Sequence, residues 1–218
     1  MLLKNIITQE IPELRISDTI EQALHIMEEY KVEHLPVVKG SVLLGTISES
    51  VLMNADEESL FITGLELFQT AIEQHQHLYD VISLMAEKKL TLIPVTDEKG
   101  FYLGQVTAKM VIHELAKSQA LTSEGSIVVL EMNKRDYSLA EIARLAESNN
   151  LTIYSAILTT SEESNKMELT LKVNKQDIQP FMQTLNRYDY EVKAFFKAPD
   201  HADDLQNRYE EFMRYLNI

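Results

Sequence analysis

The stretch Lys31-Val-Glu-His-Leu-Pro-Val-Val38 decides the fold, because a related stretch, Lys89-Leu-Thr-Leu-Ile-Pro-Val-Thr96, follows 58 residues later. Each copy comes directly after apolar residues at the spacing of an amphipathic helix. These are Ile20, Ala23, Leu24 and Met27 in the first copy and Leu78, Val81, Ile82 and Met85 in the second. All the pairs, Pro36 and Pro94 included, differ by the same 58 positions. A register that stays constant over a helix and the next strand indicates an internal duplication.

The first copy continues as turn, strand and helix. Lys39-Gly40 predicts the turn, Leu43 to Ile47 predicts the second strand, and Ser48 can cap a short helix. The first repeat is therefore assigned to residues 1–54.

The second copy has the same order with one extra turn residue. The turn is Asp97-Glu-Lys-Gly100, the strand runs from Tyr102 to Val106, and Thr107 precedes a helix that ends near Lys117. The two copies thus predict two equivalent units with the same element order.

Two helix starts have the spacing of a capping box, in which the cap residue and a residue three positions later satisfy each other's backbone N–H groups. The pairs are Asp18 with Glu21 and Ser138 with Glu141. Each box is expected to stabilise its helix by about 1 kcal/mol.

The composition excludes several functions. Of 218 residues, 34 are acidic and 20 basic, which gives a net charge of -14 and argues against nucleic-acid binding, since phosphate contacts depend on Lys and Arg. The absence of cysteine excludes disulfides and thiol nucleophiles and fits a cytoplasmic protein. No apolar run reaches the roughly 18 residues of a membrane span, so no membrane association is expected.

After about residue 118 the pattern changes. Strands and helices are expected in the order strand, helix, strand, strand, helix, strand, which is the ferredoxin-like plan. The expected elements are the strand Ile127 to Met132, a helix with the apolar face Leu139, Ile142, Ala143 and Ala146, the strands Thr152 to Leu158 and Met167 to Val173, a helix with Ile178, Phe181, Met182 and Leu185, and the strand Glu191 to Phe196. A last helix, from Pro199 and Asp200, carries the apolar stripe Leu205, Tyr209, Phe212, Met213 and Leu216.

We therefore predict an α/β (α+β) protein with six segments. They are the first repeat (1–54), an inter-repeat linker (55–70), the second repeat (71–118), a short linker (119–125), a ferredoxin-like βαββαβ domain (126–197) and a C-terminal amphipathic helix (200–218). We expect the C-terminal helix to dock on its own chain or on a dimer mate; the alternative is a helix that binds a partner protein.

The duplicated unit, residues 1–118, resembles a pair of CBS domains, named after cystathionine beta-synthase. The resemblance rests on the helix, the apolar-Pro-Val strand, the glycines Gly45 and Gly104, and the Ser or Thr at the start of the last helix. It implies tandem repeats that form one module, associate as a homodimer and bind an adenine nucleotide between the repeats. The implied ligands are AMP, ADP, ATP or S-adenosylmethionine, and no cofactor is required.

The resemblance also implies which residues hold the ligand. The base lies against the strand before the proline, and the phosphates meet the Ser or Thr at the helix start, where the helix dipole favours an anion. The preferred second cleft comprises Thr91, Ile93, Pro94, Thr107 and Lys109, and the first cleft comprises Thr8, His34, Pro36 and Ser48.

Two departures from the family pattern leave an alternative open. The family usually has an Asp three residues after the Ser or Thr, which holds the ribose, but Val51 and Met110 stand there. Glu49 would also repel a phosphate in the first cleft. The alternative is that both clefts are structural remnants.

Residues 126–197 resemble an ACT domain, a ferredoxin-like module that often binds amino acids at dimer interfaces. The match rests on element order and on Leu139-Ala-Glu-Ile-Ala-Arg-Leu145 followed by Asn150-Leu-Thr-Ile153. The ligand loop would be Lys134, Arg135, Asp136 and Tyr137, with Tyr137 where the family has a glycine. Pairing of subunits is therefore the expected role. A CBS pair followed by an ACT domain is similar to bacterial acetoin-utilisation proteins.

No set of residues with the pattern of a catalytic site is present. His113-Glu-Leu-Ala-Lys117 begins like a zinc-protease motif but has Lys in place of the second His. His75 and His77 with Asp80 could hold a metal, but an exposed turn is the favoured interpretation, so no metal site is expected.

The predicted function is a non-catalytic, ligand-sensing regulatory protein that is cytoplasmic and homodimeric. Its CBS pair would bind an adenine nucleotide and signal through dimer geometry to an unidentified protein partner. The alternative is a constitutive oligomerisation or scaffold protein with vestigial CBS and ACT ligand sites.

Overall fold

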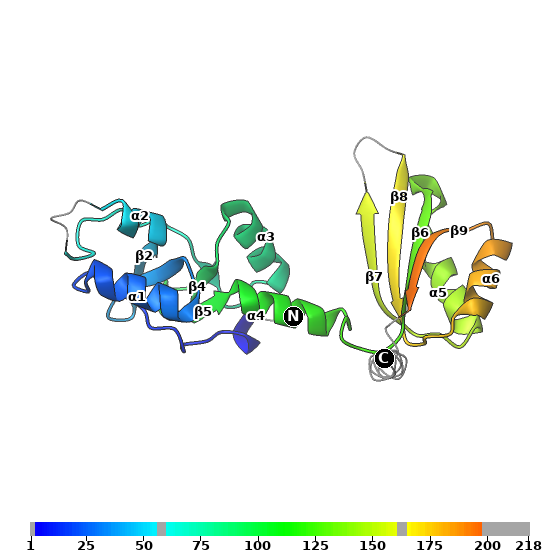
Figure 1. Cartoon of the computed structure of the whole chain (residues 1–218), viewed down its shortest axis with the longest axis horizontal. Helices are drawn as coiled ribbons and strands as arrows, with labels where there is room; N and C mark the ends of the chain where they lie inside the picture. The colour runs from blue at the N-terminus through cyan, green and yellow to red at the C-terminus, as the bar shows by residue number, and fades with distance from the viewer. Residues whose placement is uncertain (1–2, 56–59, 161–164, 198–218) are drawn as a thin grey trace, which may run out of the picture. The chain divides into compact units, whose positions relative to one another are not determined.

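The structure is a computed structural model that describes residues 3–55, 60–160 and 165–197 (Figure 1). Its contacts divide the chain into two compact units, with the boundary after Leu115. No helix among these residues has the length and apolarity that a membrane span requires. The predicted C-terminal helix, residues 200–218, lies outside the described residues.

The first repeat has the predicted elements. They are α1 (Ile20–Tyr30), β1 (His34–Lys39), β2 (Val42–Ser48) and α2 (Glu49–Met53). β1 and β2 form an antiparallel hairpin in which Pro36 lies opposite Thr46. Before α1, Leu14 makes a single parallel bridge to Val37, which is its only sheet pairing among the described residues.

The second repeat has the same order with one additional short strand. It consists of β3 (Ile72–Glu73), α3 (Leu78–Lys88), β4 (Leu92–Thr96), β5 (Tyr102–Thr107) and α4 (Ala108–Ser118), with the sheet order β3-β4-β5. The duplication extends to the backbone: Lys31 and Lys89 end α1 and α3 in the same left-handed conformation, with φ of 56° and 53°. Both repeats thus share the order helix, strand, strand, helix, and β3 is additional in the second.

The first helix begins one residue later than the capping box predicted. Thr19, not Asp18, is the cap: its hydroxyl accepts a hydrogen bond from the Gln22 N–H, and the Gln22 side chain accepts one from the Thr19 N–H. Asp18 instead accepts a hydrogen bond from the Arg15 N–H at 2.8 Å. Ser138 does cap its helix, by accepting from the Glu141 N–H.

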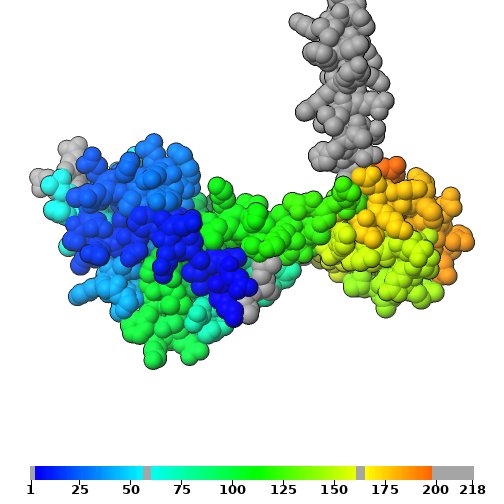
Figure 2. All heavy atoms as spheres, turned by 90° about the horizontal axis from the view of Figure 1, so that it is seen from below, coloured from blue at the N-terminus to red at the C-terminus, as the bar shows by residue number. Residues whose placement is uncertain are grey.

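The two repeats exchange their leading segments. Thr8 pairs with Gln105 of the second repeat, and Phe68 pairs with Thr46 of the first. Leu3, in the 3₁₀ turn η1 (Leu3–Asn5), and Ile6 accordingly lie in the core of the second repeat, where Figure 2 shows the dark blue N-terminal atoms against green ones. Ile62, from the segment before β3, lies in the core of the first repeat. Neither repeat has a complete core of its own.

The exchanged segments approach β2 and β5 closely at two glycines. The Gln69 side-chain amide donates to the Leu44 carbonyl at 2.8 Å, and the Gln9 amide donates to the Leu103 carbonyl at 2.9 Å. Each glutamine therefore fastens its segment next to the equivalent glycine, Gly45 or Gly104.

The second unit is a four-stranded antiparallel sheet with two helices on one face (Figure 1). Its elements are β6 (Ser126–Asn133), η2 (Lys134–Asp136), α5 (Leu139–Ser148), β7 (Ile153–Thr160), β8 (Lys166–Val173), α6 (Gln179–Arg187) and β9 (Glu191–Lys197). The sheet order is β7-β8-β6-β9, which is the predicted ferredoxin-like plan.

The core of this unit lies between the sheet and its helices. Alternate residues of β6 and β8 point toward the helices and meet the apolar stripes of α5 and α6. Val128, Leu130, Leu169, Leu171, Ile142, Leu145, Phe181 and Leu185 are almost fully buried. The predicted stripes are confirmed at Ile142, Phe181 and Leu185, but the assignment of Leu139 to the buried face is wrong, since it is 41% exposed at the start of α5.

Gly104→Ala should destabilise the first unit because a Cβ atom would lie 2.6 Å from the Thr8 carbonyl oxygen and 2.7 Å from Ile7 Cγ2, at a φ of 141°. Strain and overpacking together should cost about 3 kcal/mol. Gly100→Ala is the control, because its φ is also positive but nothing lies within 4 Å. Urea unfolding of the full chain followed by circular dichroism would measure both, and equal losses would contradict the close approach.

Candidate functional site

The predicted ligand residues of the CBS-like unit lie on different faces of its two hairpins, because successive residues of a strand point to opposite faces. Directly paired residues of an antiparallel hairpin share one face. His34 pairs with Ser48, and Pro36 pairs with Thr46, so these four share a face of the first hairpin. The equivalent face of the second hairpin carries Leu92 with Thr107 and Pro94 with Gln105.

Ile93 lies on the opposite face of β4. Its side chain is fully buried in the second core together with Val81 and Met85. Only the backbone of Ile93 is therefore available to a ligand in a cleft.

Thr91 and His34, assigned from sequence to different clefts, meet in the structure. The Thr91 hydroxyl accepts a hydrogen bond from the Glu33 N–H at 2.8 Å and lies 3.1 Å from His34 Nδ1. This contact joins the segments before β1 and β4, so Thr91 is part of the connection between repeats. No local sequence pattern predicts this contact, because the partners are 57 and 58 residues apart.

Burial lowers the pKa of His34, and the nearby Glu33 carboxylate opposes this shift. The ring makes an edge contact with Phe68, with ring centroids 5.8 Å apart. A largely buried imidazole against an aromatic ring is poorly solvated as a cation, so the neutral form is favoured in the folded protein.

Thr8 lies with the second repeat. Its backbone exchanges two hydrogen bonds with Gln105, both at 2.9 Å, whereas the other first-cleft residues are on β1 and β2. Gln105 is fully buried, and its amide donates to the Ile11 carbonyl at 2.6 Å. Sequence reasoning missed Gln105, although a glutamine between glycine and valine in an otherwise apolar strand was a usable signal.

The two helix starts differ in ways that matter for an anion. The α2 helix has five residues and carries Glu49 in its first turn, and the Ser48 hydroxyl accepts from the Val51 N–H at 3.4 Å. The α4 helix has eleven residues and no acidic residue in its first turn, and Lys109 there is exposed. The Thr107 hydroxyl accepts from the Met110 N–H at 3.3 Å.

A hollow of about 540 Å³ lies beside α2. It is lined by Ser50, Val51, Asn54, Ala55, Thr63, Gly64, Leu65 and Glu66. Its single charged residue is acidic, so this hollow does not favour a phosphate.

Of the two histidines considered as metal ligands, His75 and His77, the second has a structural role. The His77 ring accepts a hydrogen bond from the Tyr79 N–H at 3.2 Å, and Asp80 accepts one from the His77 N–H at 2.9 Å, so both residues cap α3. His75 lies near Glu73 and Glu98. Within the described ranges no group of three potential ligands could hold a metal ion.

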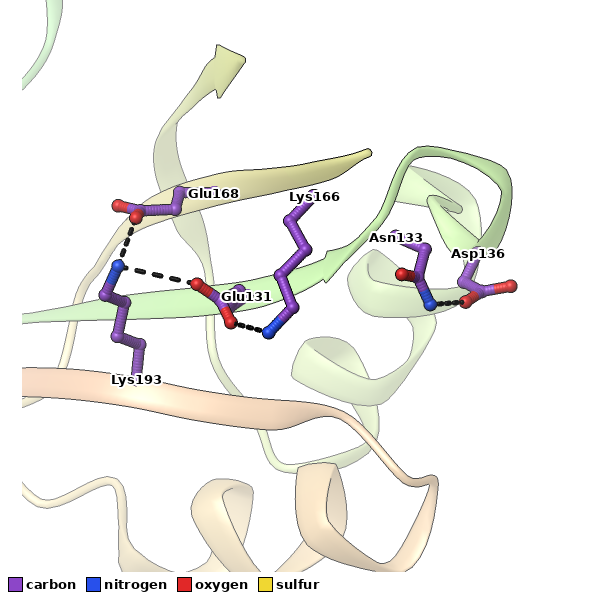
Figure 3. Close-up of polar contacts among 6 residues, drawn as sticks. All are labelled: Glu131, Asn133, Asp136, Lys166, Glu168 and Lys193. Atoms are coloured by element: carbon purple, nitrogen blue, oxygen red, sulfur yellow. Dashed lines mark hydrogen bonds and ion pairs between the residues drawn. The ribbon is translucent and has the colours of Figure 1, made fainter. Parts of the chain in front are cut away.

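In the ferredoxin-like unit, the predicted loop residues differ in burial, and Arg135 Nε lies 3.4 Å from an Asp136 carboxylate oxygen. Lys134 and Arg135 are exposed, while Tyr137 packs against the core. Asp136 accepts a hydrogen bond from the Asn133 amide at 2.7 Å (Figure 3).

Asp136 also lines a hollow of about 480 Å³. The hollow is strongly acidic and is lined by Glu131, Met132, Asn133, Asp136, Glu141, Lys166, Tyr188, Asp189, Tyr190 and Glu191. Burial and the hydrogen bond to Glu141 raise the pKa of Tyr190 to about 12. Five carboxylates against one lysine disfavour the carboxylate of an amino acid.

The lowered pKa of His34 predicts a pH dependence of stability. Because the folded pKa lies below 6.5, the unfolded chain binds more protons between the two values, and the free energy of unfolding rises with pH there. The contribution is complete above 6.5 and is lost as pH falls. His34→Gln should remove this part of the slope in urea titrations between pH 5 and 7.5, and the exposed His113→Gln should not. Identical slopes would contradict the assignment.

The CBS domain model matches residues 3–58 and 70–117. Inosine-5'-monophosphate dehydrogenase of Korarchaeum cryptofilum (strain OPF8) is 26% identical over 112 residues, which are 50% of this chain and 23% of that enzyme. The chain thus spans less than a quarter of the length of this curated relative.

Solved structures match over about half of this chain. A CBS domain pair/ACT domain protein of Thermotoga maritima has 22% identity and a TM-score of 0.48, with 54% of this chain and 98% of that chain covered. AcuB of Vibrio cholerae has 22% identity and a TM-score of 0.48, with 56% and 95% covered. CBSX2 of Arabidopsis thaliana, in complex with AMP, has 22% identity and a TM-score of 0.47, with 53% and 96% covered.

The match to the family model covers both repeats and omits most of the segment between them. It agrees with the duplicated register, the paired hairpins and the equivalent helix ends. The N-terminal unit of this chain is therefore a CBS domain pair.

Proposed function

We propose that this chain is a non-catalytic regulatory protein whose CBS pair binds an adenine nucleotide at the second cleft. The protein is cytoplasmic and homodimeric, and the bound nucleotide alters the geometry of the paired repeats. CBS-pair proteins are typically regulatory, which supports this class of function over an enzyme.

The observation that carries the choice of cleft is the difference between α4 and α2. A long helix with a cation in its first turn attracts a phosphate at its N-terminus, whereas a five-residue helix with a glutamate there does not. Lys109 and Thr107 therefore form the phosphate side of the proposed site.

The backbone of α4 leaves one donor for this phosphate. The Ala108 N–H donates to the Thr91 carbonyl at 2.9 Å, and the Met110 N–H donates to the Thr107 hydroxyl. Among the described residues no acceptor is found for the Lys109 N–H. Both this backbone donor and the ammonium group of Lys109 are therefore suited to binding a phosphate. Pro94 on the shared face of β4 supplies an apolar wall for the base.

The ferredoxin-like unit acts in this proposal as an ACT domain that pairs subunits and transmits the change to a protein partner. Its acidic hollow disfavours amino-acid binding, which supports a pairing role over ligand sensing.

Calorimetric titration with AMP, ADP, ATP and S-adenosylmethionine tests the nucleotide site. Lys109→Glu should weaken binding of the preferred nucleotide by about tenfold or more, because it replaces an attraction by a repulsion near the phosphate. The matched control is Lys117→Glu in the last turn of the same helix, which should leave the affinity unchanged. No heat at millimolar nucleotide, or equal effects of both variants, would contradict the second cleft.

A scaffold with vestigial clefts is the second candidate function, and the Thr91 contact favours it. The Thr91 hydroxyl is occupied by Glu33 and His34, and its carbonyl accepts from Ala108, so these polar groups are satisfied without a ligand. A site whose hydrogen bonds are already made gains little from a nucleotide.

Thermal unfolding in the presence of nucleotide separates the two functions. A ligand at 100 times its dissociation constant adds about 2.7 kcal/mol to the free energy of unfolding, which raises the melting temperature by several degrees. The regulatory protein should show this rise with at least one nucleotide, and the scaffold should show none at millimolar concentration.

A further inference from the structure

The sheet of the ferredoxin-like unit has one face that its helices do not cover. The helices α5 and α6 pack on the face of Val128, Leu130, Leu169 and Leu171. The opposite face, here called the open face, is formed by the alternate residues of the same strands. Its register gives three cross-strand rows.

The rows change in character along the sheet. The first row contains Ser155, Lys172, Ile127 and Phe196, and the second contains Ile157, Thr170, Val129 and Ala194. The third row contains Thr159, Glu168, Glu131 and Glu191. The first two rows are mainly apolar, and Phe196 and Ile157 are 57% and 45% exposed.

Two of the three glutamates in the third row, Glu131 and Glu168, form ion pairs within the sheet. Glu131 pairs with Lys166 and with Lys193, and Glu168 pairs with Lys193 (Figure 3). The hydrogen bond from Lys166 lowers the pKa of Glu131, so this carboxylate is charged and satisfied. Glu131 and Glu168 therefore need no further partner.

Lys172 in the first row is different. It lies between Ile127 and Ser155 and is 6% exposed. Within residues 3–55, 60–160 and 165–197, no hydrogen bond or ion pair is found for its ammonium group. A largely buried cation without a carboxylate partner indicates that an anionic group belongs beside it.

The chain leaves the sheet at this row. Lys197, the last residue of β9, pairs with Ser126, next to the Ile127–Phe196 pair. The segment that follows, residues 198–218, lies outside the described residues, and its sequence has five acidic and two basic residues. Three of the acidic residues, Asp200, Asp203 and Asp204, come first.

We propose that residues 198–218 of the same chain cover the open face, with an aspartate of their first turns at Lys172 and their apolar stripe on the first two rows. The stripe consists of Leu205, Tyr209, Phe212, Met213 and Leu216, whose spacing is that of one helix face. The charge of the segment matches the cation, and its apolar side matches Ile127, Val129, Ile157 and Phe196.

The lengths also agree. A helix of residues 200–218 would be about 28 Å long. The eight residues of β6 span about 26 Å. Starting from the first row, the segment reaches the second row near Leu205 to Tyr209, which places these residues over Thr170.

Disulfide crosslinking tests this placement. Because the sequence has no native cysteine, any disulfide must form between the introduced residues. Full-length chains would carry Thr170→Cys together with Leu205→Cys or Tyr209→Cys. The matched control is Thr170→Cys with Asn207→Cys, which lies between these positions in sequence but on the opposite side of a helix.

An oxidant should convert at least one of the first two variants to a crosslinked monomer. With an effective concentration in the millimolar range, this reaction should be about 100-fold faster than crosslinking between chains of separate, non-associated molecules at about 10 µM. The Asn207 control should remain reduced. Equal rates for the control, no crosslink in any variant, or a product of dimer size alone would overturn the proposal, the last by assigning the face to a second copy.

The role of the Lys172 charge is tested in the same crosslinking assay, with variants that remain folded. Lys172→Glu should slow intramolecular crosslinking by about tenfold or more, because it would place a carboxylate where the aspartates must lie. Lys175→Glu, an exposed lysine three residues further on, should have no effect. Unchanged rates with Lys172→Glu would overturn the role of this cation. The proposal concerns the ferredoxin-like unit alone, so it does not depend on nucleotide binding.

Discussion

The CBS pair depends on the exchange of its leading segments. Residue Thr8 closes the sheet of the second repeat at Gln105, and Phe68 closes that of the first at Thr46. Each repeat therefore contributes backbone hydrogen bonds and apolar side chains to its neighbour, and neither core is complete without the other. The tight approach at Gly45 and Gly104, where a Cβ atom would meet the crossing segment within 3 Å, fixes the position of both segments.

The exchange explains why the clefts are not equivalent, although the repeats are. The duplicated register places Pro36 and Pro94 on matching faces, but Thr91 of the second copy bonds to Glu33 and His34 of the first. The hydrogen-bonding groups between the repeats are thus satisfied to different extents in the two clefts. The copies differ most in the helix after each hairpin. The helix of the first copy, α2, is short and has an acidic residue in its first turn, whereas α4 of the second copy is long and has Lys109 there.

Local patterns predicted most of the fold, because alternation and helical spacing are properties of neighbouring residues. They located both hairpins and the whole ferredoxin-like order. They failed by one residue at Thr19, since Ser17, Asp18 and Thr19 are all good caps and the choice depends on Gln22. The Thr91 contact and the side chain of Ile93 could be placed only by the structure. The first joins residues far apart in sequence, and the second depends on which face of β4 meets the core.

The exchanged segments also bear on the order in which the chain can fold. Thr8 is synthesised well before its partner Gln105, which follows almost a hundred positions later, and the Gln105 side chain donates a hydrogen bond to the Ile11 carbonyl over a separation of 94. Contacts between residues so far apart in sequence slow folding, because the entropy cost of closing the loop comes before the contacts that stabilise it have formed. During synthesis the N-terminal lead must therefore wait, with Leu3 and Ile6 unburied, until β5 has emerged. The first hairpin in turn stays incomplete until Phe68 is present, so the CBS pair forms as one cooperative folding unit and not as two successive ones.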